Sequence, residues 1–260
     1  MTPLYAGIGG VVRELTDMHT GINGVVTPLT EMWAGVGGVN RQIFIEEPKV
    51  GDLEIGDIFQ LRENLVPVDY IVVHQGLPSS MYDASCDGTW LLRKDIAEDR
   101  IWSSAGNNVL ESSDILAYLN GDWLGRYDSD LRNAIKQVKI PYRSGGASGT
   151  DQSGANGLLC KIFPLSPKEL GFSGNSSKDV PDDGAKLSYF LTGENSTASK
   201  KRIANFNGSP YSWWTRSQIL GGASKQVWIV SSTGRFTDWW SSDYTAGVRP
   251  ALILPSDFRI

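Results

Sequence analysis

The sequence predicts an α+β fold, in which short strands and short helices are interleaved and joined by long loops. Strand-like runs such as Thr89–Arg93 alternate irregularly with helix-like runs such as 113–121, rather than in regular strand-helix-strand units. The 29 Gly and 12 Pro of the 260 residues favour turns and short strands over long helices. A chain of this length can bury a substantial core, so we expect a globular protein without a doubly wound parallel sheet.

Charge and hydropathy narrow the classes of function. The net charge is −5 and the basic residues form no run, which argues against a nucleic-acid partner, because neutralising phosphates takes clustered Lys and Arg. No apolar run approaches the roughly 18 to 20 residues that cross a bilayer, so no membrane partner is expected. The N-terminus lacks the features of a secretory signal peptide. If the protein acts outside a cell, it would then need another route of release, such as cell lysis together with a virus particle.

Histidine and cysteine are scarce, and this limits the chemistry that the chain is expected to perform. The only examples are His19, His74, Cys86 and Cys160. His74 stands alone at a strand end, so we expect a structural hydrogen bond rather than catalysis. Two buried thiols are expected for the cysteines, with a disulfide as the alternative. We predict no catalytic residue, no metal site and no cofactor.

Residues 1–43 are dominated by an internal repeat of 14 residues. The run 6–19 matches 20–33, and 34–43 begins a third copy. Each copy contains a Gly-rich turn followed by a short apolar strand. Fourteen residues cannot enclose a core, so the copies are expected to stack on one another or on other chains. A flexible Gly-rich tether is the alternative, but the repeated Val, Leu and Met favour an attachment or oligomerisation module, with a homo-oligomer such as a trimer.

The repeat resembles the short Gly-Val-Gly-Gly-Val units of minor structural and tail proteins in phages of Gram-positive gut bacteria. The resemblance implies a virion, as part of a phage tail, or a prophage-derived particle. That setting would account for the missing signal peptide.

Residues 44–52 are charged and rich in turn formers, and we interpret them as a linker to one domain, 53–260. Its first part predicts a hairpin from 57–62 and 68–74, a strand at 89–93 and a buried strand at 157–164.

Helix signals lie between and after these strands. Ser113 caps a predicted helix that ends at Gly121, and a second predicted helix spans 128–138. Ser166 and Glu169 have the spacing of a capping box, and 185–191 is weakly helical. The runs 143–157 and 172–184 are expected to be polar, exposed loops.

Two strand-like runs near the C-terminus predict a framework. Trp213 and Trp214 are expected to pack as scaffold, one toward the core and the other toward a face or neighbouring sheet. Arg216 and Arg249 stand between apolar neighbours, so we expect structural hydrogen bonds or ion pairs from both.

The pairing of Trp213-Trp-Thr-Arg-Ser217 with Gly247-Val-Arg-Pro-Ala-Leu252 resembles the formylglycine-generating-enzyme-like branch of the C-type lectin fold. More narrowly, it resembles the variable proteins of diversity-generating retroelements. The runs 82–92, 135–142 and 183–190 support the resemblance. It implies that 53–260 is a C-type lectin-like ligand-binding domain with a variable surface in about 211–246.

The enzymatic members of this branch differ from the chain at their key residues. No cysteine follows Cys160, although a formylglycine-generating enzyme uses a cysteine pair near its C-terminus, and a sulfoxide-synthase relative needs several iron-binding histidines. The Glu-Pro-Asn and Gln-Pro-Asp signatures of calcium-dependent lectins are also missing. The resemblance therefore implies a protein that binds a ligand without catalysing a reaction.

The segment 231–246 is too polar to belong to the core and too rich in aromatic residues for a loop without a function. Trp, Tyr and Arg supply binding energy at interface centres, and Tyr with Ser is typical of adaptable paratopes. The alternative is that Trp239 and Trp240 simply cover the fold. Two apolar residues in a polar loop, Ile219 and Leu220, are expected to extend the patch as exposed contacts. The predicted ligand-binding residues are Ile219, Leu220, Gln226, Trp228, Ser232, Arg235, Thr237, Trp239, Trp240, Ser241, Asp243 and Tyr244.

The sequence therefore predicts a non-enzymatic receptor-binding protein, a phage tail or prophage adhesin. Its diversified C-terminal surface would recognise a host cell-surface protein or glycan. Two alternatives stay open: a structural virion decoration protein without a diversified site, and an enzyme of the same fold.

Overall fold

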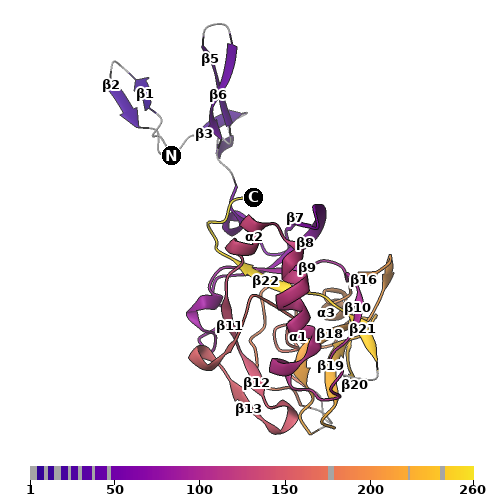
Figure 1. Cartoon of the computed structure of the whole chain (residues 1–260). Helices are drawn as coiled ribbons and strands as arrows, with labels where there is room; N and C mark the ends of the chain where they lie inside the picture. Colours follow the sequence, from indigo (N-terminus) through magenta and orange to yellow (C-terminus); the bar gives the residue numbers. More distant parts are fainter. Residues whose placement is uncertain are drawn as a thin grey trace. The chain divides into compact units, whose positions relative to one another are not determined.

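The computed structural model describes residues 48–174, 179–221, 223–240 and 244–260, together with the backbone of strands between residues 5 and 45 (Figure 1). Side chains are described within 48–237, outside the gaps, and from residue 244 onward. The chain divides into two compact units, 1–49 with 259–260, and 50–258. The division falls inside the expected linker 44–52. Strand β6 (Val39–Ile45) and the 3₁₀ turn Val50–Asp52 both enter that interval, so the connection between them is shorter than expected.

The strands described in the N-terminal repeat pair as antiparallel β-hairpins, and these hairpins run across the boundaries between the copies. The hairpins consist of β1 (Tyr5–Ile8) with β2 (Val11–Glu14), β3 (His19–Ile22) with β4 (Val25–Pro28), and β5 (Glu31–Val36) with β6. In the first hairpin Ile8 pairs with Val11, so two residues join the strands, and the sequence there is Gly-Gly. Gly-Gly and Asn-Gly, which recur at this place in each copy, are preferred in two-residue connections. The prediction of one strand after each turn was incomplete, because the residues before the turn form a strand as well.

The first large sheet of unit 50–258 is antiparallel and has the order β15-β22-β9-β8-β7. Its strands are β7 (Ile58–Glu63), β8 (Val66–Gln75), β9 (Thr89–Arg93), β15 (Ile162–Phe163) and β22 (Ala251–Leu254). The predicted hairpin of β7 and β8 and the predicted strand at 89–93 are confirmed. Strands β9 and β22 lie in the middle of the sheet and are almost wholly buried, as continuous apolar runs predict.

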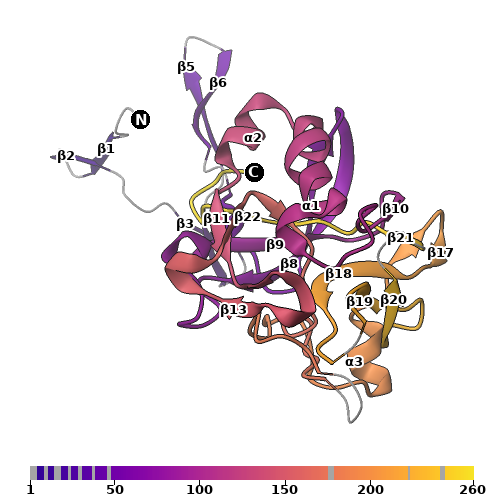
Figure 2. The ribbon, with the colours of Figure 1, turned by 60° about the horizontal axis from the view of Figure 1, so that its bottom comes forward.

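The second large sheet has the order β10-β21-β18-β19-β20. Its strands are β10 (Asp99–Ile101), β18 (Trp213–Gln218), β19 (Gln226–Val230), β20 (Phe236–Trp240) and β21 (Thr245–Gly247). All described pairings are antiparallel except the short contact of β18 with β21. In Figure 2, β18, β19 and β20 lie side by side. Strands β19 and β20 of this sheet carry five of the twelve residues predicted to bind a ligand.

The described residues hold three short α-helices: α1 (Asp114–Tyr118), α2 (Ser129–Ala134) and α3 (Ser196–Lys200). Ser113 caps α1 by accepting from Leu116 N, as predicted. The helix predicted over 128–138 ends early, and Val138 begins a strand instead. No helix forms over 185–191. The protein is sheet-rich with few helices. Smaller ladders join β11 (Val138–Ile140) to β14 (Leu158–Cys160), β12 (Tyr142–Ser144) to β13 (Thr150–Gln152), and β16 (Asn205–Phe206) to β17 (Ser209–Pro210).

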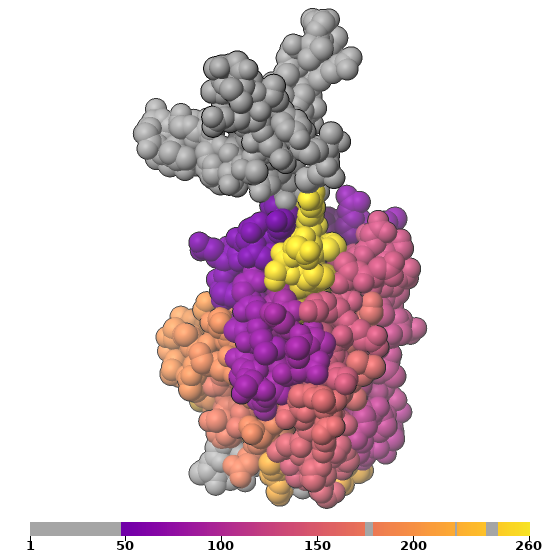
Figure 3. All heavy atoms as spheres, turned by 90° about the vertical axis from the view of Figure 1, so that its left-hand side faces the viewer, coloured from indigo at the N-terminus to yellow at the C-terminus, as the bar shows by residue number. Residues whose placement is uncertain are grey.

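The two ends of unit 50–258 meet. Val50 N donates to Phe258 O at 2.9 Å and Gly51 N donates to Ser256 O at 2.9 Å. In Figure 3 the C-terminal part of this unit, in yellow, lies on the surface beside the first residues of the unit, in indigo. These hydrogen bonds therefore join the first residues of the unit to its last residues.

A buried ion pair connects β18 to the turn after β15. Arg216 Nη1 lies 2.5 Å from Glu169 Oε2 and Nη2 lies 2.8 Å from Oε1, and both side chains are fully buried. The same carboxylate accepts from Tyr82 Oη and from the Ser166 backbone N, each at 2.8 Å. Glu169 N in turn donates to Ser166 Oγ, so the predicted capping box is confirmed. The structural role expected of Arg216 is also confirmed.

Asp183 lies beside this ion pair and is itself buried. Its backbone O accepts from Arg216 Nη2, and its Oδ2 accepts from Ser217 Oγ, both at 2.5 Å. Oδ1 is buried with no hydrogen-bond partner among the described residues. Burial raises the pKa of Asp183 to about 7, although the positive charge of Arg216 acts in the opposite direction.

The remaining structural expectations for single residues can be compared directly. Cys86 and Cys160 are free and buried, and burial raises the pKa of the Cys86 thiol to about 11. His74 Nδ1 lies 2.8 Å from Ser188 Oγ, which is the structural hydrogen bond expected. Arg249 is buried and donates from Nε to Arg93 O at 2.9 Å. The thiols, the histidine and this arginine are thus part of the framework.

Candidate ligand-binding face

Strand β20 lies at the edge of its sheet and is held there by β19. The register pairs Val230 with Phe236 at one end of this ladder and Gln226 with Trp240 at the other. The turn between the strands is closed by Ser231 N donating to Arg235 O at 2.7 Å. The predicted segment 231–246 therefore begins as a tight turn and continues as an edge strand.

A buried arginine fixes the start of this segment. Arg202 donates from Nε to Gly234 O at 2.8 Å and from Nη1 and Nη2 to the carbonyls of Leu170 and Gly193. Its guanidinium also lies 4.8 Å from the ring centre of Phe236. Phe236 N donates to Glu194 Oε1 at 2.9 Å. Side chains outside the segment thus position its turn and its first strand residue.

Four of the residues predicted to bind a ligand are exposed in the turn before β20, on β20 or just before β21. Ser232 and Arg235 are exposed in the turn, and Thr237 is exposed on β20. Tyr244, which precedes β21, is 52% exposed. The four do not form one cluster, because β18 and β19 lie between β20 and β21 in the sheet.

Two predicted contacts are wrong, because Trp228 and Ile219 are buried at 1% and 0% exposure. The ring centre of Phe172 lies 5.2 Å from that of Trp228, and Trp228 Nε1 donates to Asp179 O at 3.4 Å. Ile219 is part of the hydrophobic core and pairs its backbone N with Gln226 O. Phe172 and Asp179, which cover Trp228, belong to the loop 172–184 that was expected to be polar and exposed.

Leu220 and Gln226 are half-buried and border the loop between β18 and β19. Leu220 N donates to Asp179 O at 3.0 Å. Gln226 Oε1 accepts from Ala223 N at 2.8 Å and so holds the loop closed. The predicted residues Trp239, Trp240, Ser241 and Asp243 lie outside the part of the chain whose side chains are described.

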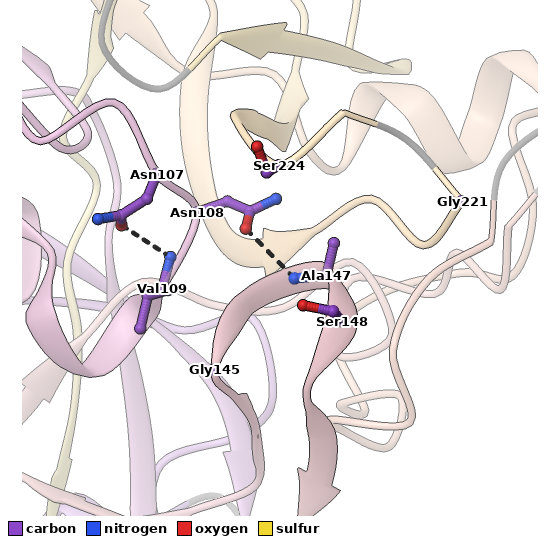
Figure 4. A pocket seen from close by; sticks show the side chains of 8 residues that line it. All are labelled: Asn107, Asn108, Val109, Gly145, Ala147, Ser148, Gly221 and Ser224. Carbon is purple, nitrogen blue, oxygen red and sulfur yellow. Dashed lines mark hydrogen bonds between the residues drawn. The ribbon is translucent and has the colours of Figure 1, made fainter.

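The sequence did not predict a pocket that opens beside this loop (Figure 4). The pocket has a volume of about 370 Å³ and is lined by residues 107–109, Gly145, Ala147, Ser148, Gly221 and Ser224. Asn108 Nδ2 donates to Gln226 O at 3.0 Å, which places the pocket against a predicted residue. The only signal in the sequence is that all three lining loops are rich in Gly, Ser or Asn, a composition typical of many loops without a site.

Replacing Gly234 by alanine is expected to destabilise the turn before β20 by more than about 2 kcal/mol. Its φ is +77°, and an added Cβ would lie 2.0 Å from Ser199 O of α3, so the substitution combines left-handed strain with a backbone clash. Gly208→Ala is the matched control, because its φ is +81° and nothing lies within 4 Å. The midpoints of urea unfolding measure both. Equal losses for the two variants would contradict the expectation.

The described residues include no group of three or more His, Cys, Asp or Glu placed to hold a metal ion. In that same part of the chain, no helix has the length and apolar character needed to cross a membrane. The exposed predicted residues Ser232, Arg235, Thr237 and Tyr244 carry hydroxyl, guanidinium and aromatic groups.

Comparison with known proteins adds a family. No curated protein matches the sequence, and no solved structure matches it. One family model, described as a domain of unknown function, DUF6273, matches residues 87–256. The matched region contains the whole second sheet and every residue predicted to bind a ligand, whereas β7, β8 and the N-terminal hairpins precede it. The chain belongs to the DUF6273 family.

Proposed function

We propose that the protein is a non-enzymatic binding protein that contacts a host cell-surface molecule through the exposed residues of the turn before β20, through Thr237 of β20 and through Tyr244 before β21. The observation that carries this proposal is the contrast between exposed Arg235 and Tyr244 and the buried framework beside them. Arg and Tyr contribute strongly to interface energy, and a pre-positioned backbone lowers the entropic cost of binding.

We further propose a C-type lectin-like fold of the formylglycine-generating-enzyme-like branch, with a diversified surface. The support is that Trp213, Trp214, Arg216 and Arg249, which carry the resemblance, are all buried framework residues. Trp213 Nε1 donates to Arg202 O, and Trp214 Nε1 donates to Arg100 O. Residues fixed in this way suit a scaffold whose surface changes while its core stays constant.

The setting that we propose is a phage tail or a prophage-derived particle. The N-terminal hairpins support it, because isolated two-stranded hairpins are marginally stable in water. Association with other copies would supply the missing contacts, and a homo-oligomer such as a trimer is the simplest arrangement.

Binding to cells tests the proposed face. The full chain carrying a fluorescent label is incubated with a panel of Gram-positive gut bacteria, and bound label is measured by flow cytometry. On cells that bind the protein, Arg235→Glu and Tyr244→Ala are each expected to weaken binding about tenfold or more.

The controls carry matched changes elsewhere on the surface. Arg62→Glu reverses an exposed charge on β7, and Leu65→Ala truncates a side chain that is 80% exposed at the β7–β8 turn. Both are expected to bind like the wild type. Unchanged binding by the Arg235 and Tyr244 variants would contradict the proposal.

Diversification has its own test in the genome that encodes the chain. We expect a neighbouring reverse-transcriptase gene and a near-copy of the codons for residues 211–250 that differs at adenines. Without them, a structural decoration protein with a fixed surface becomes the better interpretation.

A further inference from the structure

The pocket beside the β18–β19 loop is held open by two buried amides. Asn108 is 2% exposed; its Oδ1 accepts from Ala147 N at 3.2 Å while its Nδ2 donates to Gln226 O. Gln218 is 1% exposed and donates from Nε2 to Gly146 O at 3.1 Å. These bonds connect all three lining loops. A site built in this way is pre-organised, so a ligand does not have to order it.

The wall of the pocket consists of small residues with neutral polar groups. In Figure 4, Asn108, Ala147 and Ser224 face one another from three separate loops. Gly221 has no side chain to cover its backbone, Ser148 and Ser224 are exposed, and the backbone N of Gly145 already donates to Glu111 Oε1 at 2.8 Å. Hydroxyl and amide groups both donate and accept hydrogen bonds. This dual capacity matches a ligand whose own groups do the same.

Charge and shape narrow the chemistry of the ligand. None of the described residues that line the pocket is Lys, Arg, Asp or Glu, so neither an anion nor a cation finds a formal partner charge in the lining. An extended peptide usually pairs with a free strand edge. Strands β18 and β19, which the loop with Gly221 and Ser224 joins, each have neighbours on both sides and so offer no free edge at this wall. The volume of about 370 Å³ lies within the range of about 300–1,000 Å³ found for small-molecule sites.

We propose that this pocket binds a neutral, hydroxyl-rich ligand, namely a single sugar residue of a surface glycan. The inference rests on the proposed binding function and names the ligand class for a subsite beside the predicted face. Sugar hydroxyls would exchange hydrogen bonds with Ser148, Ser224 and the backbone at Gly221.

Saturation-transfer NMR with the full chain tests the inference. The probes are the methyl glycosides of glucose, galactose, rhamnose and N-acetylglucosamine at millimolar concentration, with glucuronic acid as the charged counterpart. We expect transfer to at least one neutral glycoside. Ser224→Tyr fills the pocket and is expected to reduce this transfer about tenfold, whereas Ser129→Tyr adds the same side chain at an exposed position of α2 and is expected to leave it unchanged.

Three results would overturn the inference: no transfer to any neutral glycoside, transfer to glucuronic acid alone, or equal transfer with Ser224→Tyr. Thermal unfolding verifies that each variant is folded, and Ser148→Tyr replaces Ser224→Tyr if the latter does not fold. The cell-binding assay separates the two proposals. If the wild type binds no sugar but Arg235→Glu still weakens cell binding, only the pocket proposal is refuted. If the wild type binds a sugar but Arg235→Glu leaves cell binding unchanged, only the proposed binding face is refuted.

Discussion

Glu169→Ala is expected to lower the free energy of unfolding by about 3–5 kcal/mol. The change leaves the guanidinium of Arg216 fully buried without its carboxylate, and an uncompensated buried charge is among the most destabilising defects in a protein. Tyr82 Oη and the Ser166 backbone N lose their acceptor at the same time. The effect should therefore lie toward the upper end of that range.

Urea unfolding of matched variants measures this effect. Asp69→Ala breaks the pair of Lys94 and Asp69, which has the ordinary 3.0 Å separation but side chains that are 41% and 36% exposed. That control should cost at most about 1 kcal/mol. The double variant Glu169→Leu with Arg216→Met removes both charges and should recover part of the loss. Similar costs for Glu169→Ala and Asp69→Ala would show that burial does not set the strength of the pair.

The second large effect is a dependence of stability on pH that originates in Asp183. Its pKa is raised by burial from 3.8 to about 7 in the folded chain, so the fold favours the protonated carboxyl. The unfolded chain releases this proton near pH 4. Stability from this group is fully present below the unfolded pKa and is lost as pH rises through about 7. The loss should approach about 4 kcal/mol, since the pKa shift is about three units.

Asp183→Asn isolates this contribution. The amide keeps an oxygen for Ser217 Oγ and cannot ionise, so the variant should lose less stability than the wild type as the pH rises from about 4 to about 7. Arg216, Glu169 and Asp151 also act on the carboxyl, and they are the same in both proteins. Urea midpoints at a series of pH values provide the comparison. Parallel curves for the two proteins would assign the pH dependence to other groups.

Local signals in the sequence predicted local structure well. The Ser113 cap, the capping box of Ser166 and Glu169 and the strand Thr89–Arg93 depend on residues within a few positions of one another. The helix that was predicted to reach Val138 failed for a non-local reason, because Val138 pairs with Cys160 in a sheet ladder. Periodicity alone could not reveal that partner.

The difference between local and non-local contacts also explains which features of the candidate site the sequence predicted. Trp228 and Ile219 looked exposed from their neighbours in sequence, but Phe172 and the backbone of Asp179, about fifty residues away, cover Trp228. The pocket was missed because its walls come from loops at residues 107–109, at Gly145 to Ser148 and at Gly221 and Ser224, which only the fold brings together. Exposure of Arg235 and Tyr244 agrees with the composition of their segment, because the surrounding framework needs neither side chain for its core.

The edge position of β20 bears on how this protein can change over evolutionary time. An edge strand has one ladder partner, and Arg202, Glu194 and Phe236 anchor its beginning. The exposed residues of the turn and of the strand are therefore not required to hold the sheet together. Mutations at these positions are therefore expected to alter the surface chemistry at little cost in stability, so that new surfaces would not first require compensating stabilising substitutions.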